Sequence, residues 1–450
     1  SVTTIGNGAF RECKSLETVV IGNNVTIGSD AFRLDRETNF TEEPGSYRGE
    51  NGKLVYYYIY TSPLQSLTIG ENVKIGDSAF MGAAELASVT LGDGAVIGNT
   101  AFYNAVMLKN IDLSGALSIG ASAFSGDVLY EFADQSMYEP QIDENREYVY
   151  RYYAPQLESV DLSSAESIGE AAFEFCRQLK SVKLGENIKK IPARAFNLCV
   201  ALESINLSSV TNIGESAFCE ASLTSVSLDN IVNIDKYAFV YNERLTNVSF
   251  GSTDGTRSTI SLGEGAFSYC YDLYEINGST LLREVGAYAF AYTAITDIDL
   301  SGAISIGDAA FLKEIMTDFR VVLGSSLNDL GENPFAMCKL PAFEETVEEI
   351  FNGQTFIKPT DTYDISETIK VIGGNLYRVV PNGLELICYT GDGDTVTVAD
   401  GTVRITAFAF AGSDVKQVVF PSTLKAIGHK AFYDCDKLSV VYFASYNAPI

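Results

Sequence analysis

A short phrase, Ile-Gly-x-x-Ala-Phe, returns along the whole chain and limits its fold more than any other feature. The phrase reads IGDSAF at 75–80, IGNTAF at 97–102, IGASAF at 119–124, IGESAF at 213–218 and IGDAAF at 306–311. Its last residue recurs as Phe10, Phe32, Phe80, Phe102, Phe124, Phe173, Phe196, Phe218, Phe239, Phe267, Phe290, Phe311, Phe335, Phe410 and Phe432. Ten of the fourteen intervals are 21 to 24 residues long, and the other four are about one period plus an insertion. Such a period predicts a solenoid, because one short repeat buries its apolar face only by stacking on its neighbours.

A second pattern precedes each phrase and alternates apolar with polar residues, as in Leu86-Ala-Ser-Val89-Thr-Leu91. Alternation with a period of two is typical of a strand, because successive side chains point to opposite faces. One period is therefore a strand, a turn and a glycine-led segment, and stacked periods place their strands in a parallel sheet. We expect the glycine after Ile to allow a turn conformation that a side chain would resist.

The combined pattern L-x-x-V-x-L and I-G-x-x-A-F-x-x-C-x-x-L resembles the BspA-like leucine-rich repeat, found in large surface and secreted proteins of bacteria. The resemblance covers most of residues 1–338 and again about 395–450. It implies an α/β-type repeat solenoid with repeats of about 22–23 residues and a continuous parallel β-sheet on one face. Short helices, turns or short strands are expected on the other face. It also implies a non-enzymatic binding or adhesion surface, sometimes for host proteins, outside the cell or on its surface.

Interruptions of the period predict the domain organisation. Residues 1–338 form a repeat block with β-hairpin insertions near 33–62 and 125–155, and both insertions end in a run of tyrosines. Residues 339–394 are predicted to be a spacer. Apolar residues at helical spacing indicate a short helix over 342–351, and Pro381-Asn382-Gly383 between two apolar runs indicates a hairpin. Residues 395–450 are predicted to be a second, short repeat block.

Charge and hydropathy narrow the range of partners. The formal charge of −27 repels phosphate backbones, so nucleic acid is not expected as a partner. No segment approaches the roughly 20 apolar residues of a membrane span, so no membrane insertion is expected within this chain. The chain opens partway through a repeat, so we expect the signal and anchor to lie outside it. Either earlier repeats have been removed or the chain is a piece of a longer protein.

The eight cysteines are interpreted as core residues. Six of them lie three residues after the repeated phenylalanine and so share one column: Cys13, Cys176, Cys199, Cys270, Cys338 and Cys435. We expect buried free thiols there, although a disulfide between the neighbours Cys176 and Cys199 would be geometrically feasible. Cys219 and Cys388 fall outside the column, and no cysteine spacing resembles a zinc site.

No catalytic site, metal site or cofactor site is expected. The single histidine, His429, occupies a variable position of the phrase and is interpreted as a solvated turn residue. No nucleophile motif accompanies it, so the protein is predicted not to be an enzyme. Asp392-Gly393-Asp394 lacks the further ligands of a calcium loop and is interpreted as a hairpin turn.

Two groups of residues are candidates for ligand binding. Alternation along each tyrosine run places one set of three rings on one face of its insertion. Tyrosine supplies rigid contact area with a polar tip. The alternative is that these rings only cover the solenoid edge. Two acidic pairs interrupt the small polar residues on the open face of the strands, which otherwise serve solubility. The candidates are Tyr56, Tyr58 and Tyr60, Tyr148, Tyr150 and Tyr152, and the pairs Asp112 with Asp161 and Asp297 with Asp299.

Three functions remain open on these observations. The leading hypothesis is a bacterial surface or secreted protein that binds a macromolecular partner, predicted to be a protein such as a host surface or matrix protein. A carbohydrate-binding or cell-wall-associated module is the second, with the same tyrosines stacking on sugar rings. The third is a structural spacer that displays other domains. The sequence does not specify the oligomeric state.

Overall fold

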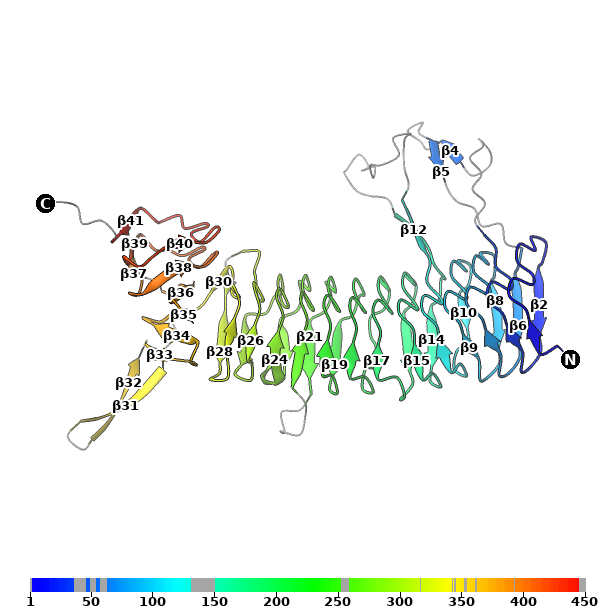
Figure 1. Ribbon diagram of the computed structural model, residues 1–450, viewed down its shortest axis with the longest axis horizontal. Coiled ribbons are helices and arrows are strands. Elements are labelled where there is room, and N and C mark those ends of the chain that lie inside the picture. The colour runs from blue at the N-terminus through cyan, green and yellow to red at the C-terminus, as the bar shows by residue number, and fades with distance from the viewer. Residues whose placement is uncertain are drawn as a thin grey trace. The chain divides into compact units, whose positions relative to one another are not determined.

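The computed structural model describes residues 2–35, 46–48, 54–56, 63–130, 150–251, 259–315, 317–341, 343, 345–351, 354–360, 362–391 and 393–444. Its contacts divide the chain into two compact units, Ser1–Val226 and Ser227–Ile450. Both units are successions of parallel β-strands, one repeat after another, as Figure 1 shows.

Each repeat contributes two strands, which form two rows. The long-strand row contains the L-x-x-V-x-L segments, such as β8 (Ser88–Leu91). The short-strand row contains the two to four residues that end at the Ile of the phrase or its equivalent, such as β9 (Val96–Ile97). Neighbouring strands in each row pair in parallel and in register, so that Ile75 lies opposite Ile97 and Leu67 opposite Val89.

In the first unit, the short-strand row contains a six-stranded sheet and two further strands. The sheet contains β1 (Thr4–Ile5), β3 (Thr26–Ile27), β7 (Lys74–Ile75), β9, β11 (Ser118–Ile119) and β15 (Ser167–Ile168), and the further strands are β17 (Lys190–Ile191) and β18 (Asn212–Ile213), which pair in parallel. The long-strand row contains β2 (Thr18–Ile21), β6 (Ser66–Ile69), β8 and β10 (Asn110–Ile111), then β14 (Ser159–Leu162) and β16 (Ser181–Leu184). The insertions contain β4 (Ser46–Arg48), β5 (Leu54–Tyr56), β12 (Asp127–Tyr130) and β13 (Tyr150–Tyr153).

The second unit begins within β19 (Ser225–Leu228) and repeats this arrangement. Its short-strand row contains β20 (Asn233–Ile234), β22 (Ile260–Leu262), β24 (Leu282–Val285), β26 (Ser305–Ile306) and β29 (Asp329–Leu330). Its long-strand row contains β21 (Asn247–Phe250), β23 (Glu275–Asn277), β25 (Asp297–Leu300) and β28 (Arg320–Leu323). A further parallel pair is β27 (Thr317–Asp318) with β30 (Cys338–Lys339).

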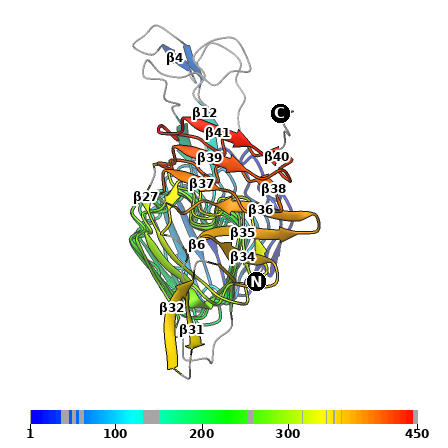
Figure 2. The same cartoon turned by 90° about the vertical axis from the view of Figure 1, so that its left-hand side faces the viewer.

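Beyond β30 the strands at first pair antiparallel and then resume the parallel repeat. β31 (Glu345–Phe351) pairs with β32 (Gln354–Thr360). A six-stranded sheet follows with β33 (Tyr363–Asp364), β34 (Ile369–Ile372), β35 (Asn375–Val380), β36 (Gly383–Cys388), β38 (Thr402–Ile405) and β40 (Ala426–Ile427). The long-strand row is continued by β37 (Thr395–Thr397), β39 (Gln417–Phe420) and β41 (Val440–Phe443), which lie one above another in Figure 2.

The repeated phenylalanines stack directly on one another and form the centre of the core. In the first unit, Phe80, Phe102 and Phe124 are fully buried, with ring centroids 5.5 and 5.2 Å apart and planes within 10°. In the second unit, Phe267 and Phe290 continue the same geometry with centroids 5.5 Å apart. Stacking one ring per repeat is what gives the core its continuity, because a single period has no core of its own.

The expected helices and α/β class are wrong: among the described residues the only helical element is the 3-10 turn η1 (Ser279–Leu281). The reason lies in the residues around each phenylalanine, where Ser78 and Gly82 both have positive φ, 55° and 78°. Their N–H groups, and that of Phe80, donate to carbonyls of the next repeat, at 2.7 to 2.9 Å. Because these N–H groups donate to carbonyls of a neighbouring repeat, they are not available for the i to i−4 hydrogen bonds of a helix.

The prediction of a short helix over 342–351 is also wrong. Residues Glu345–Phe351 form strand β31, in antiparallel register with β32 from Phe351 opposite Gln354 to Glu345 opposite Thr360. The apolar residues fit both a helical and a strand pattern over so short a run, and Asn352-Gly353 is a favourable hairpin turn pair. Pairing with a second strand therefore decides the outcome.

The expected continuous sheet is wrong for the long-strand row. In the first unit this row separates into the sheet β2–β6–β8–β10 and the pair β14–β16, and residues 202–207 carry no strand. In the second unit, β21–β23 and β25–β28 are separate groups. The first interruption lies between β10 and β14. The chain between these two strands contains the second insertion, which adds about 27 residues to the ordinary period.

Candidate functional site

The structure describes only part of the predicted tyrosine site. Tyr58, Tyr60 and Tyr148 lie outside the described residues. The backbone of Tyr56 ends β5, which pairs antiparallel with β4 in a register that places it opposite Ser46. The backbones of Tyr150 and Tyr152 lie in β13, opposite Tyr130 and Val128 of β12. The tyrosine runs as a ligand site therefore remain a prediction.

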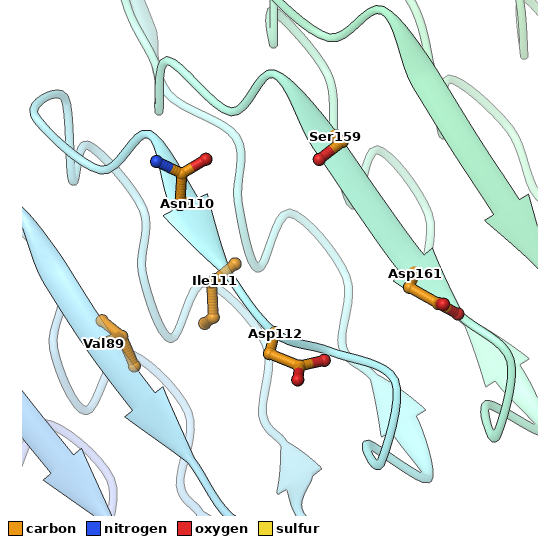
Figure 3. Close-up of a pocket in the computed structure, with 6 residues that line it drawn as sticks. All are labelled: Val89, Asn110, Ile111, Asp112, Ser159 and Asp161. Carbon is orange, nitrogen blue, oxygen red and sulfur yellow. The ribbon is translucent and has the colours of Figure 1, made fainter.

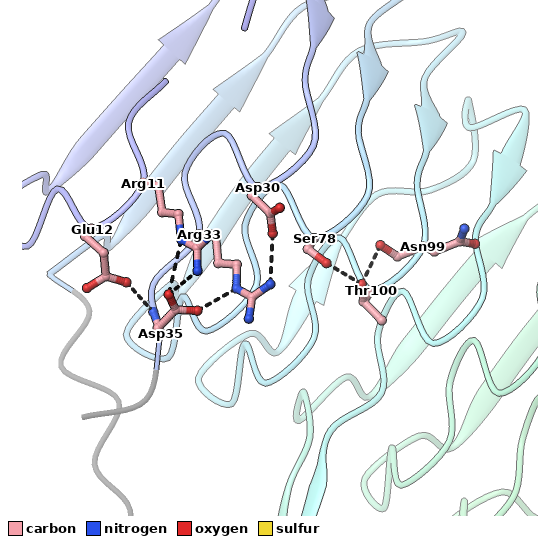
Figure 4. Close-up of polar contacts among 8 residues, drawn as sticks. All are labelled: Arg11, Glu12, Asp30, Arg33, Asp35, Ser78, Asn99 and Thr100. Atoms are coloured by element: carbon pink, nitrogen blue, oxygen red, sulfur yellow. Dashed lines mark hydrogen bonds and ion pairs between the residues drawn. The ribbon is translucent and has the colours of Figure 1, made fainter. Parts of the chain in front are cut away.

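An ion-pair network fixes the point at which the first insertion leaves the repeats (Figure 4). Arg11 and Arg33 both donate to the carboxylate of Asp35, with Arg11 Nη2 at 2.5 Å and Arg33 Nε at 2.7 Å. Arg33 also reaches Asp30 Oδ1 at 3.0 Å, and the Asp35 N–H donates to Glu12 Oε1. The hydrogen bond from Arg11, followed by the charge of Arg33, lowers the pKa of Asp35 below its usual value. Its share of the stability is thus present at neutral pH and lost as the pH falls through that lowered pKa.

The second insertion leaves the repeats beside an opening in the long-strand row. Between β10 and β14 the described backbone bond is Glu158 N–H to Lys109 O, at 3.3 Å, and the strands separate beyond it. A depression of about 350 Å³ lies there. Figure 3 shows its lining residues, which are Val89, Asn110, Ile111, Asp112, Ser159 and Asp161. The structure thus brings the predicted pair Asp112 and Asp161 to one site.

Both carboxylates also close the turn that follows their strand. Asp112 Oδ1 accepts from the Ser114 N–H at 2.9 Å and from its hydroxyl at 2.6 Å, and Asp161 makes the same bonds with Ser163. The side-chain hydrogen bond from the serine is the largest cause that lowers the pKa of each aspartate. Both are therefore anionic at neutral pH. Lys183 donates to Asp161 Oδ2 at 2.9 Å, whereas Asp112 Oδ2 has no partner among the described residues.

In the second predicted acidic pair, one of the two carboxylates has a basic partner. Asp297 accepts from Arg320 Nε at 2.8 Å, and these residues lie opposite each other in β25 and β28. Asp299 Oδ1 caps the same kind of turn as Asp112, accepting from the Ser301 N–H at 2.9 Å. Asp297 and Arg320 also line a larger cavity of about 1000 Å³ in the second unit. Asp297 and Asp299 as an acidic contact patch remain a prediction.

The described residues show no arrangement typical of an enzyme or metal site. No group of three or more His, Cys, Asp or Glu in this part of the chain is placed to hold a metal ion. His429 is exposed, with its ring edge-on to Phe408 at 6.2 Å. Lys313 is buried, which lowers its pKa to about 8, and its Nζ donates to the carbonyls of Thr293 and Ile295. Its two carbonyl partners give Lys313 a structural role.

All eight cysteines are free, so no disulfide joins Cys176 to Cys199. In five repeats the thiol of the column cysteine donates to the carbonyl of the phenylalanine one repeat earlier, as Cys176 does to Phe124 at 3.2 Å. Burial raises the pKa of Cys176 well above its usual range. Cys13 differs from the expectation, because it lies in the first repeat and is exposed.

A ladder of tyrosines in the second unit was missed by the sequence analysis. The rings of Tyr241, Tyr269 and Tyr292 stack with centroids 4.6 Å apart at both steps. Each is the second residue after a core phenylalanine. The signal that identifies them is this shared column, two residues after each phenylalanine.

Comparison with known proteins identifies the repeat. A family model described as the BspA type leucine-rich repeat region matches residues 1–41, 53–136, 146–257, 253–358 and 388–448, with 6 copies. A leucine-rich cell surface protein from Faecalibacterium prausnitzii is 24% identical with a TM-score of 0.39, covering 64% of this chain and 61% of its own. A leucine-rich repeat protein from Bacteroides ovatus is 16% identical with a TM-score of 0.45, covering 98% and 82%. This chain thus spans about three fifths of the Faecalibacterium protein.

No curated protein matches the chain. Within the described residues, the structure contains no helix with the length and apolar character needed to cross a membrane.

Proposed function

The chain belongs to the BspA-type leucine-rich repeat family, and on that premise we propose that it is a non-enzymatic, adhesion-type protein of the bacterial surface that binds a protein partner. The binding site is the depression between β10 and β14, together with the insertion that leaves the repeats beside it. The observation that supports the proposal is this opening in the long-strand row, whose lining includes two anionic carboxylates and the buried side chains of Val89 and Ile111.

The chemistry of the depression supports recognition of a macromolecule. Asn110, Asp112 and Ser159 are exposed on a face of otherwise small polar residues, so the depression is open to a large partner. Asp112 uses one carboxylate oxygen in its turn and presents the other outward. Anionic acceptors beside a shallow apolar floor suit a protein surface that offers hydrogen-bond donors or a cationic side chain.

The test uses an isosteric change that leaves the turns intact. In the double variant Asp112→Asn with Asp161→Asn, the amide oxygen can still accept from the serine N–H, as Asn206 does from Ser208 at 3.0 Å. Asp299→Asn makes the same change in a turn of the second unit and is the control. The full chain is screened by surface plasmon resonance against purified host matrix proteins, and in parallel on a glycan array.

The double variant should bind the matched protein at least about tenfold more weakly, a loss of about 1.4 kcal/mol, while Asp299→Asn binds like the wild type. A further variant that replaces residues 127–153 with a short Gly-Ser linker removes β12 and β13 and tests the contribution of the second insertion. Equal binding by wild type and double variant would exclude the depression as the site. Binding to glycans alone would favour the carbohydrate alternative.

A further inference from the structure

Three tyrosines on successive repeats form a stacked aromatic surface outside the core. The planes of Tyr241 and Tyr269 are within 17°, and those of Tyr269 and Tyr292 within 16°. A fourth ring, Tyr271, lies edge-on to Tyr269 with centroids 6.1 Å apart, so the surface has two differently oriented walls. Both faces of Tyr269 are covered by its neighbours in the stack. Tyr271 is 45% exposed and does not belong to the stack, and Tyr241 is 41% exposed.

The fold itself does not require aromatic residues at this position. The three tyrosines have φ of 59° to 60°, a left-handed conformation shared by the second residue after most of the core phenylalanines. Other repeats hold Gly82, Asn104, Leu198, Glu220 or Met337 there. Glycine and asparagine suit a positive φ better than tyrosine does. Backbone geometry therefore does not explain why tyrosine occupies this position in three neighbouring repeats.

Two carboxylates lie close enough to the tyrosine surface to act on it electrostatically. Glu243 and Glu314 are exposed, and both act on Tyr271: its pKa is raised by partial burial first and then by these two charges. The charge of Glu314 also raises the pKa of Tyr292, after burial and the neighbouring rings. Glu264 accepts a hydrogen bond from the Tyr237 hydroxyl at 2.5 Å. Two basic residues lie near these groups: Arg244 follows Glu243 in the sequence, and buried Lys313 donates to the carbonyl of Thr293, next to Tyr292.

We propose that Tyr241, Tyr269, Tyr271 and Tyr292, with Glu243 and Glu314, form a docking surface for an arginine- or lysine-rich segment of a partner protein. A cationic side chain stacks on the exposed ring of Tyr271, which packs edge-on against Tyr269, because the aromatic quadrupole attracts a cation to a ring face. Its charged head pairs with Glu243 or Glu314, whose charges both act on Tyr271. Arginine fits better than lysine because its planar guanidinium both stacks and forms two hydrogen bonds.

Charge complementarity selects this occupant over the alternatives. A second copy of the chain would bring its own charge of −27 to the surface and be repelled. Neutral sugars also stack on aromatic rings but carry no positive charge to pair with the flanking carboxylates. The surface lies in the second unit and the depression between β10 and β14 in the first, so this inference goes beyond the proposed function and can fail independently of it.

The test measures binding of a synthetic peptide, acetyl-(Arg-Gly)₄-amide, to the full chain by calorimetry. The comparison peptides contain lysine or neutral citrulline in place of arginine. The double variant Tyr269→Asn with Tyr292→Asn removes two rings, leaves the net charge unchanged, and places at both positions the residue that occurs as Asn104. Tyr274→Asn, at a site 60% exposed and outside the ladder, is the matched control.

We expect the arginine peptide to bind best, and the ladder variant to weaken it at least about tenfold while Tyr274→Asn leaves it unchanged. Should the ladder variant fold poorly in a thermal unfolding assay, Glu243→Gln with Glu314→Gln tests the same surface. Its control, Glu17→Gln with Glu186→Gln, changes two exposed carboxylates of the first unit and gives the same net charge. Weakening confined to the first of these pairs supports the proposal.

Equal peptide binding by wild type and ladder variant would overturn the inference, because the attraction would then come from net charge alone. Binding of the citrulline peptide as tight as that of the arginine peptide would overturn it as well. The inference would also be overturned if none of the peptides bound and the wild type, but not the ladder variant, bound to glycans on an array.

Discussion

The glycine of the repeated phrase suits the close approach of neighbouring repeats. We expected it to adopt a conformation closed to other residues, but the positive φ is found two positions later, at Ser78, Thr100 and Ser122. A Cβ on Gly98 would instead lie 2.7 Å from the carbonyl carbon of Gly76 in the preceding repeat. The glycine column therefore allows short-strand turns to stack at their observed spacing.

Gly98→Ala should lower the free energy of unfolding by about 1–3 kcal/mol, the usual cost of overpacking a tight site. Gly6→Ala is the control, since a Cβ there meets nothing within 4 Å. Pro192, Asp235 and Thr406 hold the same position in other repeats, so the clash should cost stability without abolishing the fold. Guanidinium chloride unfolding measures both variants, and equal midpoints would contradict the close-approach argument.

At the scale of the element, the phenylalanine ladder determines how each repeat is held. Phe102 is fully buried and stacks on Phe80 and Phe124 at 5.5 and 5.2 Å. Beside it, hydrogen bonds run from one repeat to the next instead of along a helix. Side-chain stacking and backbone hydrogen bonds therefore both join each repeat to its neighbours.

Phe102→Ala should destabilise the protein by about 3–5 kcal/mol, because the cavity removes contacts on both sides of the ring. Phe10→Ala, at a ring that is 43% exposed and stacks on Phe32, should cost clearly less. Hydrogen exchange would locate the effect, with faster exchange expected in β7, β9 and β11. A loss below about 1 kcal/mol for Phe102→Ala would mean that stacking is not a main source of stability.

The sequence predicted the repeat, the strands and the core phenylalanines, because each of these has a periodic pattern. It did not predict that the turns contain no helix. Their conformation depends on left-handed residues such as Ser78 and Gly82, and these residues produce no periodic pattern of apolar side chains in the sequence. The pairing of Asp112 with Asp161 was expected from their column, and the structure places them at one depression. The opening beside them depends on how an insertion separates two strands, which no local pattern encodes.

At the scale of the molecule, the repeat continues through a segment of different topology. In the second unit, the antiparallel strands β33–β36 follow the last long block of repeats and precede the short one. They are attached to β29 mainly through side chains: Thr368 Oγ1 donates to Asn328 O at 2.6 Å, and Arg378 Nη1 to Leu330 O at 2.5 Å. A partly buried pair, Arg378 with Glu385, is at the centre of this attachment.

Arg378→Met should test whether this attachment stabilises the second unit. The variant leaves Glu385, whose side chain is 13% exposed, with only Arg404 at 3.8 Å, and an under-paired buried charge should cost about 1–3 kcal/mol. Adding Glu385→Leu should recover most of that loss, because removing both partners leaves no buried charge. Lys370→Met is the control, since it breaks a surface pair with Asp364 that should contribute less than about 1 kcal/mol. Chemical denaturation, with hydrogen exchange of β34–β36, measures all three; a double variant no more stable than Arg378→Met would show that the loss does not come from the unpaired carboxylate.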